Sequence, residues 1–298
     1  MIFNLTRRFV VKLLALGAFL GFGKKRAQAA KAAALIETDQ IDQWQKTHDR
    51  IWIGGEFWSN PMEDWRVNEG WAQCQTTAGN RSLHSVTRQI KDTAASFAMS
   101  VELSESAPIK NNAGAGFRIG VRSDLNEYRS NCFAKNGINA GIVGKQLVLG
   151  KGRQALSKPV KKSHVILSLV GNPQGDRYVL QLTAKDAGSG KEIGRISQKV
   201  SPSAIAGNIA LVSQYEGPQR RFAIPGYRFR NWQVGGDAIK HSTQQTFGPL
   251  LWTMYSLSDS RGKEGFVLKL TALTGPLGKD DNQQVELQVN REGNWVSL

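Results

Sequence analysis

Four arginines have a spacing that could hold a negatively charged ligand. Arg118 and Arg122 are four positions apart, and Arg228 and Arg230 are two positions apart. Residues at an even separation point to the same face of a β-strand. A guanidinium presents a planar fork of N–H donors that matches sulfate, phosphate or carboxylate oxygens. The pattern predicts an anion-binding sheet face; the alternative is that these side chains only keep a sheet face hydrated. The candidate ligand-binding residues are Arg118, Arg122, Tyr128, Arg129, Arg228 and Arg230.

A second group of candidate binding residues lies in the stretch GEFWSNPMEDWRVNEGW, residues 55–71. Its tryptophans could form a platform for a sugar or belong to a core. Trp65 stands in Asp-Trp-Arg-Val and Trp232 in the similar Asn-Trp-Gln-Val. These matched strand patterns predict that both indoles lie in the core and that the two segments close the same sheet. Trp58 and Trp71 stand beside turn residues, so their side chains could be exposed to solvent.

Catalytic arrangements are not visible in this sequence. Glu102 and Glu105 are an odd number of positions apart, which places them on opposite faces of a strand and excludes a glucanase-like pair there. No Gly-x-Ser-x-Gly elbow and no Gly-rich phosphate loop with lysine occurs. The four histidines are scattered without ligand spacing. We therefore expect no metal and no cofactor in this chain.

Cys74 and Cys132 are the only cysteines. Two cysteines cannot form a Cys-rich zinc site. A disulfide between them is one alternative, and two ordinary buried thiols are the other.

The chain is basic, with 39 Lys and Arg against 24 Asp and Glu. The first 29 residues hold six of the basic residues and no acid, and the remaining chain keeps 33 basic and 24 acidic residues, a net of +9. Basicity favours anionic partners such as acidic glycans or phosphorylated ligands. No run of five basic residues occurs, so we expect no nucleic-acid partner.

The N-terminal residues have the order of an export signal. Residues 6–12 read TRRFVVK and resemble the twin-arginine signal, with Arg7 and Arg8 as the paired arginines. A short apolar stretch follows, then Lys-Lys-Arg, then Ala-Gln-Ala, which predicts cleavage after Ala29. The apolar stretch is too short for a permanent membrane anchor. The resemblance implies export by the twin-arginine translocase to the periplasm or the cell exterior.

Short period-two runs separated by Gly, Asn, Pro and Asp fill most of the chain after residue 50. This pattern, without long helical periodicity, predicts an all-β antiparallel β-sandwich. The predicted strands are 97–103, 115–122, 142–149, 165–170, 178–184, 192–200, 209–213 and 228–234.

Four regions are predicted along the chain. Residues 1–29 are the signal and 30–50 are a linker with a short helix. Residues 51–236 are the sandwich, and 237–298 are the start of a second β-module with strands at 250–257, 265–273 and 283–289. Three strands cannot bury a core alone. They therefore either pair with the sandwich or belong to a module that is cut short.

Several stretches resemble a known family. WIGGEFWSNPMEDWRVNEGW, GNRSLHSVTRQI and AGFRIGVRSDLNEYRS are similar to the N-terminal region of exported PhoD-like phosphatases. FGPLLWTMYSLSDS and VLKLTALTGPLGKDDNQQVELQV are similar to the small β-module that follows in that family. The resemblance implies a concanavalin A-like jelly roll in front of a metallophosphatase domain.

The chain departs from that family where the chemistry would be. A two-metal phosphatase needs Asp-x-His and Gly-Asn-His motifs, and neither occurs here. The first hypothesis is therefore a non-catalytic part of an exported PhoD-like phosphatase system that acts as a scaffold or substrate-targeting module, with a separate catalytic domain as partner. The second is a stand-alone exported lectin-like module that binds acidic glycans or other polyanions. An enzyme with an unrecognised site in the sandwich is the third.

Overall fold

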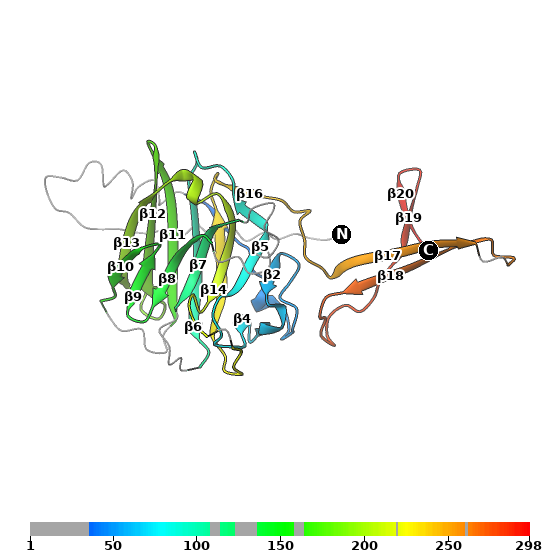
Figure 1. Cartoon of the computed structure of the whole chain (residues 1–298), viewed down its shortest axis with the longest axis horizontal. Helices are drawn as coiled ribbons and strands as arrows, with labels where there is room; N and C mark the ends of the chain where they lie inside the picture. The colour runs from blue at the N-terminus through cyan, green and yellow to red at the C-terminus, as the bar shows by residue number, and fades with distance from the viewer. Residues whose placement is uncertain (1–35, 108–113, 123–135, 158–163, 219, 260–261) are drawn as a thin grey trace.

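The computed structural model describes residues 36–107, 114–122, 136–157, 164–218, 220–259 and 262–298. The predicted signal with Arg7, Arg8 and Ala29 lies outside these residues, as do Tyr128, Arg129 and Cys132. Two antiparallel sheets, here named sheet A and sheet B, face each other in the larger part of the molecule (Figure 1).

Within the described residues, each of the two sheets has eight strands. Sheet A contains, in spatial order, β13 (Glu192–Val200), β12 (Arg177–Asp186), β11 (Val165–Gln174), β6 (Phe97–Glu105), β15 (Tyr227–Gly235), β4 (Trp71–Cys74) and β3 (Trp65–Asn68), with β1 (Thr38–Gln40) paired to β15. Sheet B contains β10 (Gly152–Ala155), β9 (Gln146–Leu149), β8 (Ile138–Val143), β7 (Ala115–Val121), β14 (Gly207–Ser213), β5 (Arg81–Ile90) and β16 (Ile239–His241), with β2 (Phe57–Asn60) paired to β5.

The core lies between the sheets and is built from alternating strand residues. On β6, Phe97, Met99 and Val101 are buried in the apolar cluster, and on β7 Phe117 and Ile119 join them. This alternation is what a half-buried strand requires. The predicted fold class, an all-β antiparallel sandwich, is confirmed.

The matched tryptophans are core residues. Trp65 and Trp232 are 1% and 0% exposed. Trp65 packs beside Phe229, and Trp232 stacks on Phe57 with 5.8 Å between ring centroids. β3 and β15 lie in the same sheet, with β4 between them. The prediction from the repeated Trp motif is confirmed.

The strand boundaries differ from the prediction in several places. Residues 142–149 form the end of β8, a turn and β9 rather than one strand. The ten-residue β5 was not among the predicted strands. Residues 30–50 were expected to be a linker with a short helix, but β1 is a strand of sheet A and only a three-residue 3₁₀ turn, Trp44–Lys46, follows it.

After β16 the chain leaves the sandwich. β17 (Leu250–Asp259) pairs with β18 (Phe266–Thr274), and β19 (Gln288–Arg291) pairs with β20 (Asn294–Ser297), as two separate hairpins. The first hairpin projects from the sandwich in Figure 1. Residues 283–287 are not a strand, in contrast to the prediction.

Helices are short throughout the described part of the chain. Besides Trp44–Lys46, two more 3₁₀ turns occur at Met62–Asp64 and Pro202–Ala204. None of these helices has the length and apolarity that crossing a bilayer would need.

Candidate functional site

The predicted arginines do not form one site. Arg118 lies on β7 in sheet B and Arg122 follows that strand, whereas Arg228 and Arg230 lie on β15 in sheet A. Side chains that point away from the core on these strands therefore lie on opposite outer faces of the sandwich. The expected common arginine face is wrong, because alternation along a strand does not say to which sheet the strand belongs.

The sheet A arginines hold a tryptophan. Trp71 is only 3% exposed, with the guanidinium carbons of Arg228 and Arg230 at 4.6 and 4.1 Å from its ring centroid. Arg230 Nη2 lies 2.7 Å from Glu102 Oε1, and Arg228 Nη1 lies 3.6 Å from a Glu69 carboxylate oxygen. Both charges already have acidic neighbours and an aromatic face, so this cluster serves packing better than ligand capture.

A row of polar and aromatic residues crosses the outer face of sheet B. In the strand register Asn139 is opposite Arg118, Arg118 is opposite Ala210, Ala210 is opposite His84, and His84 is opposite Trp58. Opposite residues of neighbouring strands share a face and lie within side-chain reach. Five strands thus place these side chains in one line.

Arg118 forms the wall of a recess at one end of this row. Its Nε donates to Asn139 Oδ1 at 2.8 Å and its Nη1 donates to Asn80 Oδ1 at 2.5 Å. The recess has a volume of about 180 Å³ and is lined by Gly79, Asn80, Arg118, Asn139, Tyr215, Glu216 and Gly217. Arg118 is 2% exposed, and burial lowers the pKa of its guanidinium from its ordinary value, although arginine stays charged at physiological pH.

His84 lies between Ala210 and Trp58 in the row and is held at both nitrogens. Its Nδ1 lies 2.7 Å from Asn208 Oδ1, which can only accept, and its Nε2 lies 2.9 Å from the Ser82 hydroxyl. Burial lowers the pKa of the imidazole, and the hydrogen bond with Asn208 opposes that change. A neutral imidazole with Nδ1 protonated satisfies both contacts.

Trp58 ends the row beside His84, with 5.4 Å between the ring centroids. Its side chain is partly exposed, as is that of Trp52, whereas Trp44, Trp65 and Trp71 are buried. Trp58 is therefore the indole of the aromatic stretch with a surface that a ligand could reach.

Tyr215 is positioned over the same face by two glycines. A Cβ at Gly116 or Gly141 would lie 2.7 or 2.4 Å from the Tyr215 hydroxyl oxygen, so neither position has room for a larger residue. The hydroxyl donates to the carbonyl of Phe117 at 2.9 Å. Burial raises the pKa of Tyr215 far above its ordinary value, so the phenol stays protonated.

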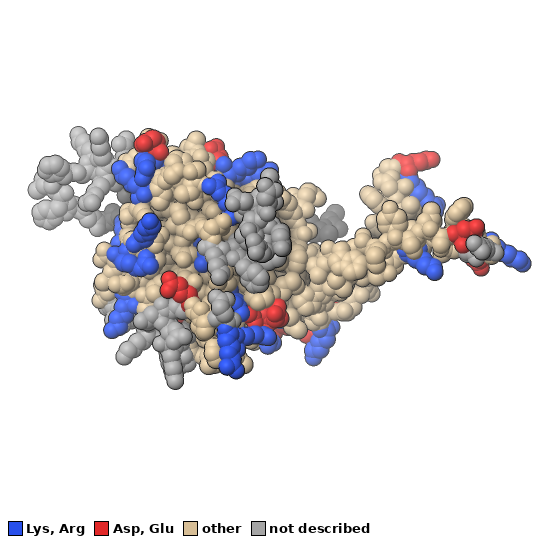
Figure 2. Space-filling model, viewed as in Figure 1, with Lys and Arg blue, Asp and Glu red and all other residues tan. Residues whose placement is uncertain are grey.

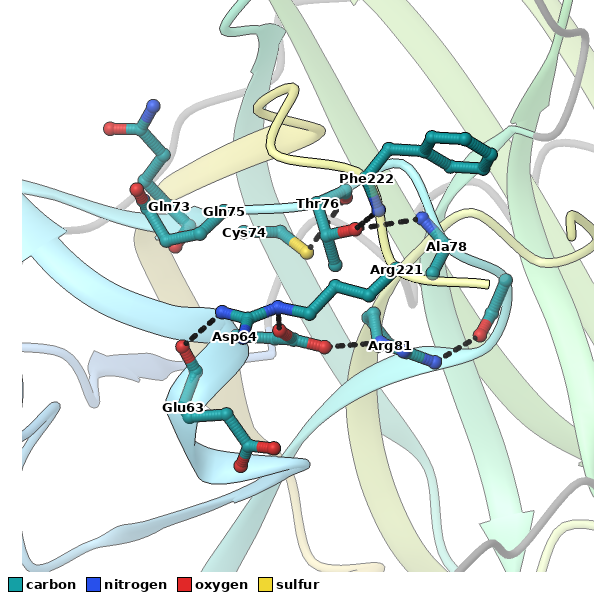
Figure 3. A network of polar contacts seen from close by, with 11 residues as sticks. Glu63, Asp64, Gln73, Cys74, Gln75, Thr76, Ala78, Arg81, Arg221 and Phe222 are labelled. Atoms are coloured by element: carbon teal, nitrogen blue, oxygen red, sulfur yellow. Dashed lines mark hydrogen bonds and ion pairs between the residues drawn. The ribbon is translucent and has the colours of Figure 1, made fainter. Parts of the chain in front are cut away.

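The opposite wall of the recess is held by a buried ion-pair network (Figure 3). Asp64 is fully buried; its Oδ2 lies 2.6 Å from Arg81 Nε and its Oδ1 lies 2.5 Å from Arg221 Nε. Arg81 Nη1 also donates to the carbonyl of Gly79 at 2.8 Å, and Arg221 Nη2 donates to the carbonyl of Glu63 at 3.2 Å. Arg81 begins β5 and Arg221 stands in the connection from β14 to β15. One carboxylate thus joins both segments that line the recess.

Thr76 reinforces the same junction. Its hydroxyl oxygen accepts hydrogen bonds from the backbone N–H of Ala78 at 3.2 Å and of Phe222 at 3.1 Å (Figure 3). Cys74 is a buried free thiol that donates to the carbonyl of Thr76 at 3.3 Å. Burial raises the pKa of this thiol to about 11, which makes it unreactive near neutral pH.

Charge on the sandwich is distributed rather than gathered into one stripe. Lys and Arg side chains are spread over the face of the sandwich seen in Figure 2. Within the described residues, no group of three or more His, Cys, Asp and Glu side chains could hold a metal ion.

Comparison with known proteins gives a structural likeness only. No protein-family model and no curated protein sequence matches the chain. The chain is similar in structure to lectins. Lectin II from Ulex europaeus is 12% identical with a TM-score of 0.44, and the match covers 63% of this chain and 97% of that one. Basic winged bean lectin with Tn-antigen is 11% identical with a TM-score of 0.44, covering 64% and 97%. Arcelin-5, a lectin-like defense protein from Phaseolus vulgaris, is 12% identical with a TM-score of 0.40, covering 64% and 97%. Similarity at this level says nothing about the ligand.

Proposed function

We propose that this chain is an exported, non-catalytic β-sandwich module that binds carbohydrate on the outer face of sheet B. The observation that carries the proposal is the recess at Arg118, which lies on the same face of sheet B as the partly exposed Trp58 ring; Ala210 and His84, which lie between them in the register, are buried. Sugars combine apolar C–H faces with hydroxyl groups, and they are complementary to an aromatic ring next to amide and guanidinium groups. Asn139 in the row and Asn80 in the recess supply the amide groups.

The proposed ligand is an acidic glycan. The positive charge of Arg118 at the wall of the recess favours the anionic oxygens of a uronate or sulfate, and the chain after the predicted signal carries a net charge of +9. The recess of about 180 Å³ is below the range of about 300–1,000 Å³ that holds drug-sized ligands, so it fits one sugar ring or its charged substituent.

The site supports binding rather than hydrolysis. Glycoside hydrolysis uses two carboxyl groups on either side of the scissile bond. Among the residues that line the recess in the described part of the chain, Glu216 is the one acid. One acid does not make such a pair, so we propose binding as the role of this recess.

Replacing Trp58 with alanine tests the proposal. We expect the change to weaken glycan binding about fivefold, because stacking on an aromatic ring contributes on the order of 1 kcal/mol. Calorimetry of the protein with neutral, sulfated and uronate oligosaccharides measures the effect, and binding to the acidic ones should weaken with added salt. Trp295→Ala is the matched control, since Trp295 is 68% exposed on β20, outside the sandwich. Equal binding by Trp58→Ala and Trp295→Ala, or no binding of any glycan by the unmodified protein, would reject the site.

A second candidate function is a scaffold or targeting module of a PhoD-like phosphatase system. It is supported by the sequence resemblance and by the second β-module, residues 250–297, that follows the sandwich. We propose that a separately encoded phosphatase domain with Asp-x-His and Gly-Asn-His motifs completes the activity. Co-purification of this chain with the product of the neighbouring reading frame tests this idea. We expect phosphomonoester hydrolysis only in the presence of both; a frame without these motifs would remove the candidate.

A further inference from the structure

The hairpin of β17 and β18 has one face that is almost entirely apolar. In the strand register Tyr255 is opposite Leu270 and Leu257 is opposite Leu268, while Phe266 is opposite Asp259 at the far end. These pairs alternate with Met254–Thr271, Ser256–Lys269 and Ser258–Val267 on the other face. The first face therefore carries mostly large apolar side chains, whereas the other face mixes polar residues with Met254, Val267 and the Trp252–Leu273 pair.

This apolar face is exposed to solvent. Tyr255, Leu257, Phe266, Leu268 and Leu270 are 73, 65, 76, 58 and 45% exposed. Together they present roughly 600 Å² of apolar side chain, as much as the largest patch on a typical monomer. Figure 2 shows the projecting hairpin as a mostly uncharged surface. An exposed apolar patch of this size is typical of a surface that binds another molecule.

The sandwich of the same chain does not cover this face. The connection between the two parts is at the base of the hairpin, where Phe247 N donates to the carbonyl of Gly55 at 2.6 Å. Arg50 Nη1 lies 2.9 Å from Asp281 Oδ1 at the same place. These contacts hold the base of the second module and leave the face of Tyr255, Leu257 and Leu268 uncovered.

We propose that the apolar face of the hairpin docks against the same face of a second copy of this chain. Two faces of roughly 600 Å² bury about 1,200 Å² together, which reaches the size of a specific protein–protein interface. Among the described residues, the face bears one charged side chain, Asp259 near the tip. In an antiparallel two-fold arrangement each Asp259 lies over the base of the other hairpin, so like charges do not meet.

The test is the oligomeric state of the full chain. Sedimentation at about 100 µM protein is expected to give a dimer, and the double variant Leu257→Glu/Leu268→Glu is expected to halve the mass, because facing carboxylates would be buried. The matched control Ser256→Glu/Thr271→Glu adds the same charge to the opposite face of the same strands and is expected to stay dimeric. The sandwich is separate from the hairpin, so all three proteins should show the same thermal unfolding of the sandwich.

Three outcomes would overturn the inference. One is a monomeric unmodified chain at the same concentration. Another is equal dissociation of both double variants. The third is a monomeric chain that floats with phosphatidylcholine vesicles and loses this property in Leu257→Glu/Leu268→Glu, which would assign the face to lipid. Glycan binding at sheet B is measured independently and does not depend on the result.

Discussion

Replacing Asp64 with alanine is expected to lower the free energy of unfolding by about 3–5 kcal/mol. The change removes a fully buried carboxylate and leaves the side chain of Arg81, which is 11% exposed, without its ion-pair partner. An unpaired buried guanidinium loses its hydration without compensation. Urea unfolding followed by tryptophan fluorescence measures the loss.

Arg221→Ala is the matched control for this prediction. The Arg221 side chain is 54% exposed, so its contact with Asp64 is screened by water and should contribute about 1 kcal/mol or less. Asp64→Asn should lie between the two, because a carboxamide has one acceptor oxygen for two guanidinium groups. If Asp64→Ala loses no more stability than Arg221→Ala, the network does not hold the junction.

Replacing Asp64 should also weaken glycan binding at the proposed site. Asp64 joins the start of β5 to the β14–β15 connection, and the backbone N–H groups of Gly79 and Asn80 donate to the carbonyls of Pro218 and Gln214 at 2.9 and 2.6 Å. Loss of the carboxylate removes one of the contacts that hold these segments together, beside the backbone hydrogen bonds and those of Thr76. If the folded Asp64→Asn variant keeps the full glycan affinity, Asp64 contributes to stability and not to glycan binding.

Asp42→Asn is expected to stabilise the protein at alkaline pH. Asp42 is fully buried beside β15, and its Oδ1 accepts a hydrogen bond from Trp232 N at 2.6 Å. Burial raises the pKa of this carboxyl to about 6, and backbone hydrogen bonds from Trp232 and Asn231 only partly oppose it. The charged form is therefore costly in the folded state. An asparagine keeps the acceptor oxygen without the charge.

The pH dependence follows from the direction of the shift. Below the unfolded pKa of about 4, Asp42 is protonated in both states and has no effect. Between about 4 and 6 the unfolded chain releases the proton while the folded protein keeps it, so stability falls as pH rises. Above the folded pKa the loss is constant at about 3 kcal/mol.

Thermal or urea unfolding of both proteins from about pH 4 to pH 8 checks this prediction. The difference in unfolding free energy between Asp42→Asn and the unmodified protein should grow over that range by up to about 3 kcal/mol and then level off. Asp49→Asn, in the same segment but exposed, is the control and should show little change. A difference for Asp42→Asn that does not vary with pH would contradict the assignment.

The alternation of apolar and polar residues in the sequence was sufficient to predict the fold class. The strands around Phe97, Phe117 and Leu180 have apolar residues at every second position, and they form the core as expected. β5 was missed because its core residues Leu83 and Ile90 are seven positions apart, with polar residues between that are buried in the sheet. Its place in sheet B depends on pairing with β14 and β2, which local sequence does not encode.

The candidate site was predicted only in part. Arg118 was correctly singled out as an outward position of its strand, but its neighbours Asn139 and His84 come from β8 and β5 and could not be chosen without the register. Arg228 and Arg230 were assigned to the same face, although they lie on the other sheet. The exposure of Trp58 could be predicted from the sequence, because this residue stands beside a turn. Trp71 also stands beside a turn, but arginines cover it.

The pairing of β1 with β15 has a consequence for the order of synthesis. Thr38 is matched with Gly235, so the first described strand meets its partner only after almost 200 further residues have left the ribosome. Contacts between such distant segments make folding slow, because a long loop must close before they form. We expect the nascent chain to keep its leading segment loose until the last sandwich strand emerges, and the closure of this pair to mark completion of the domain.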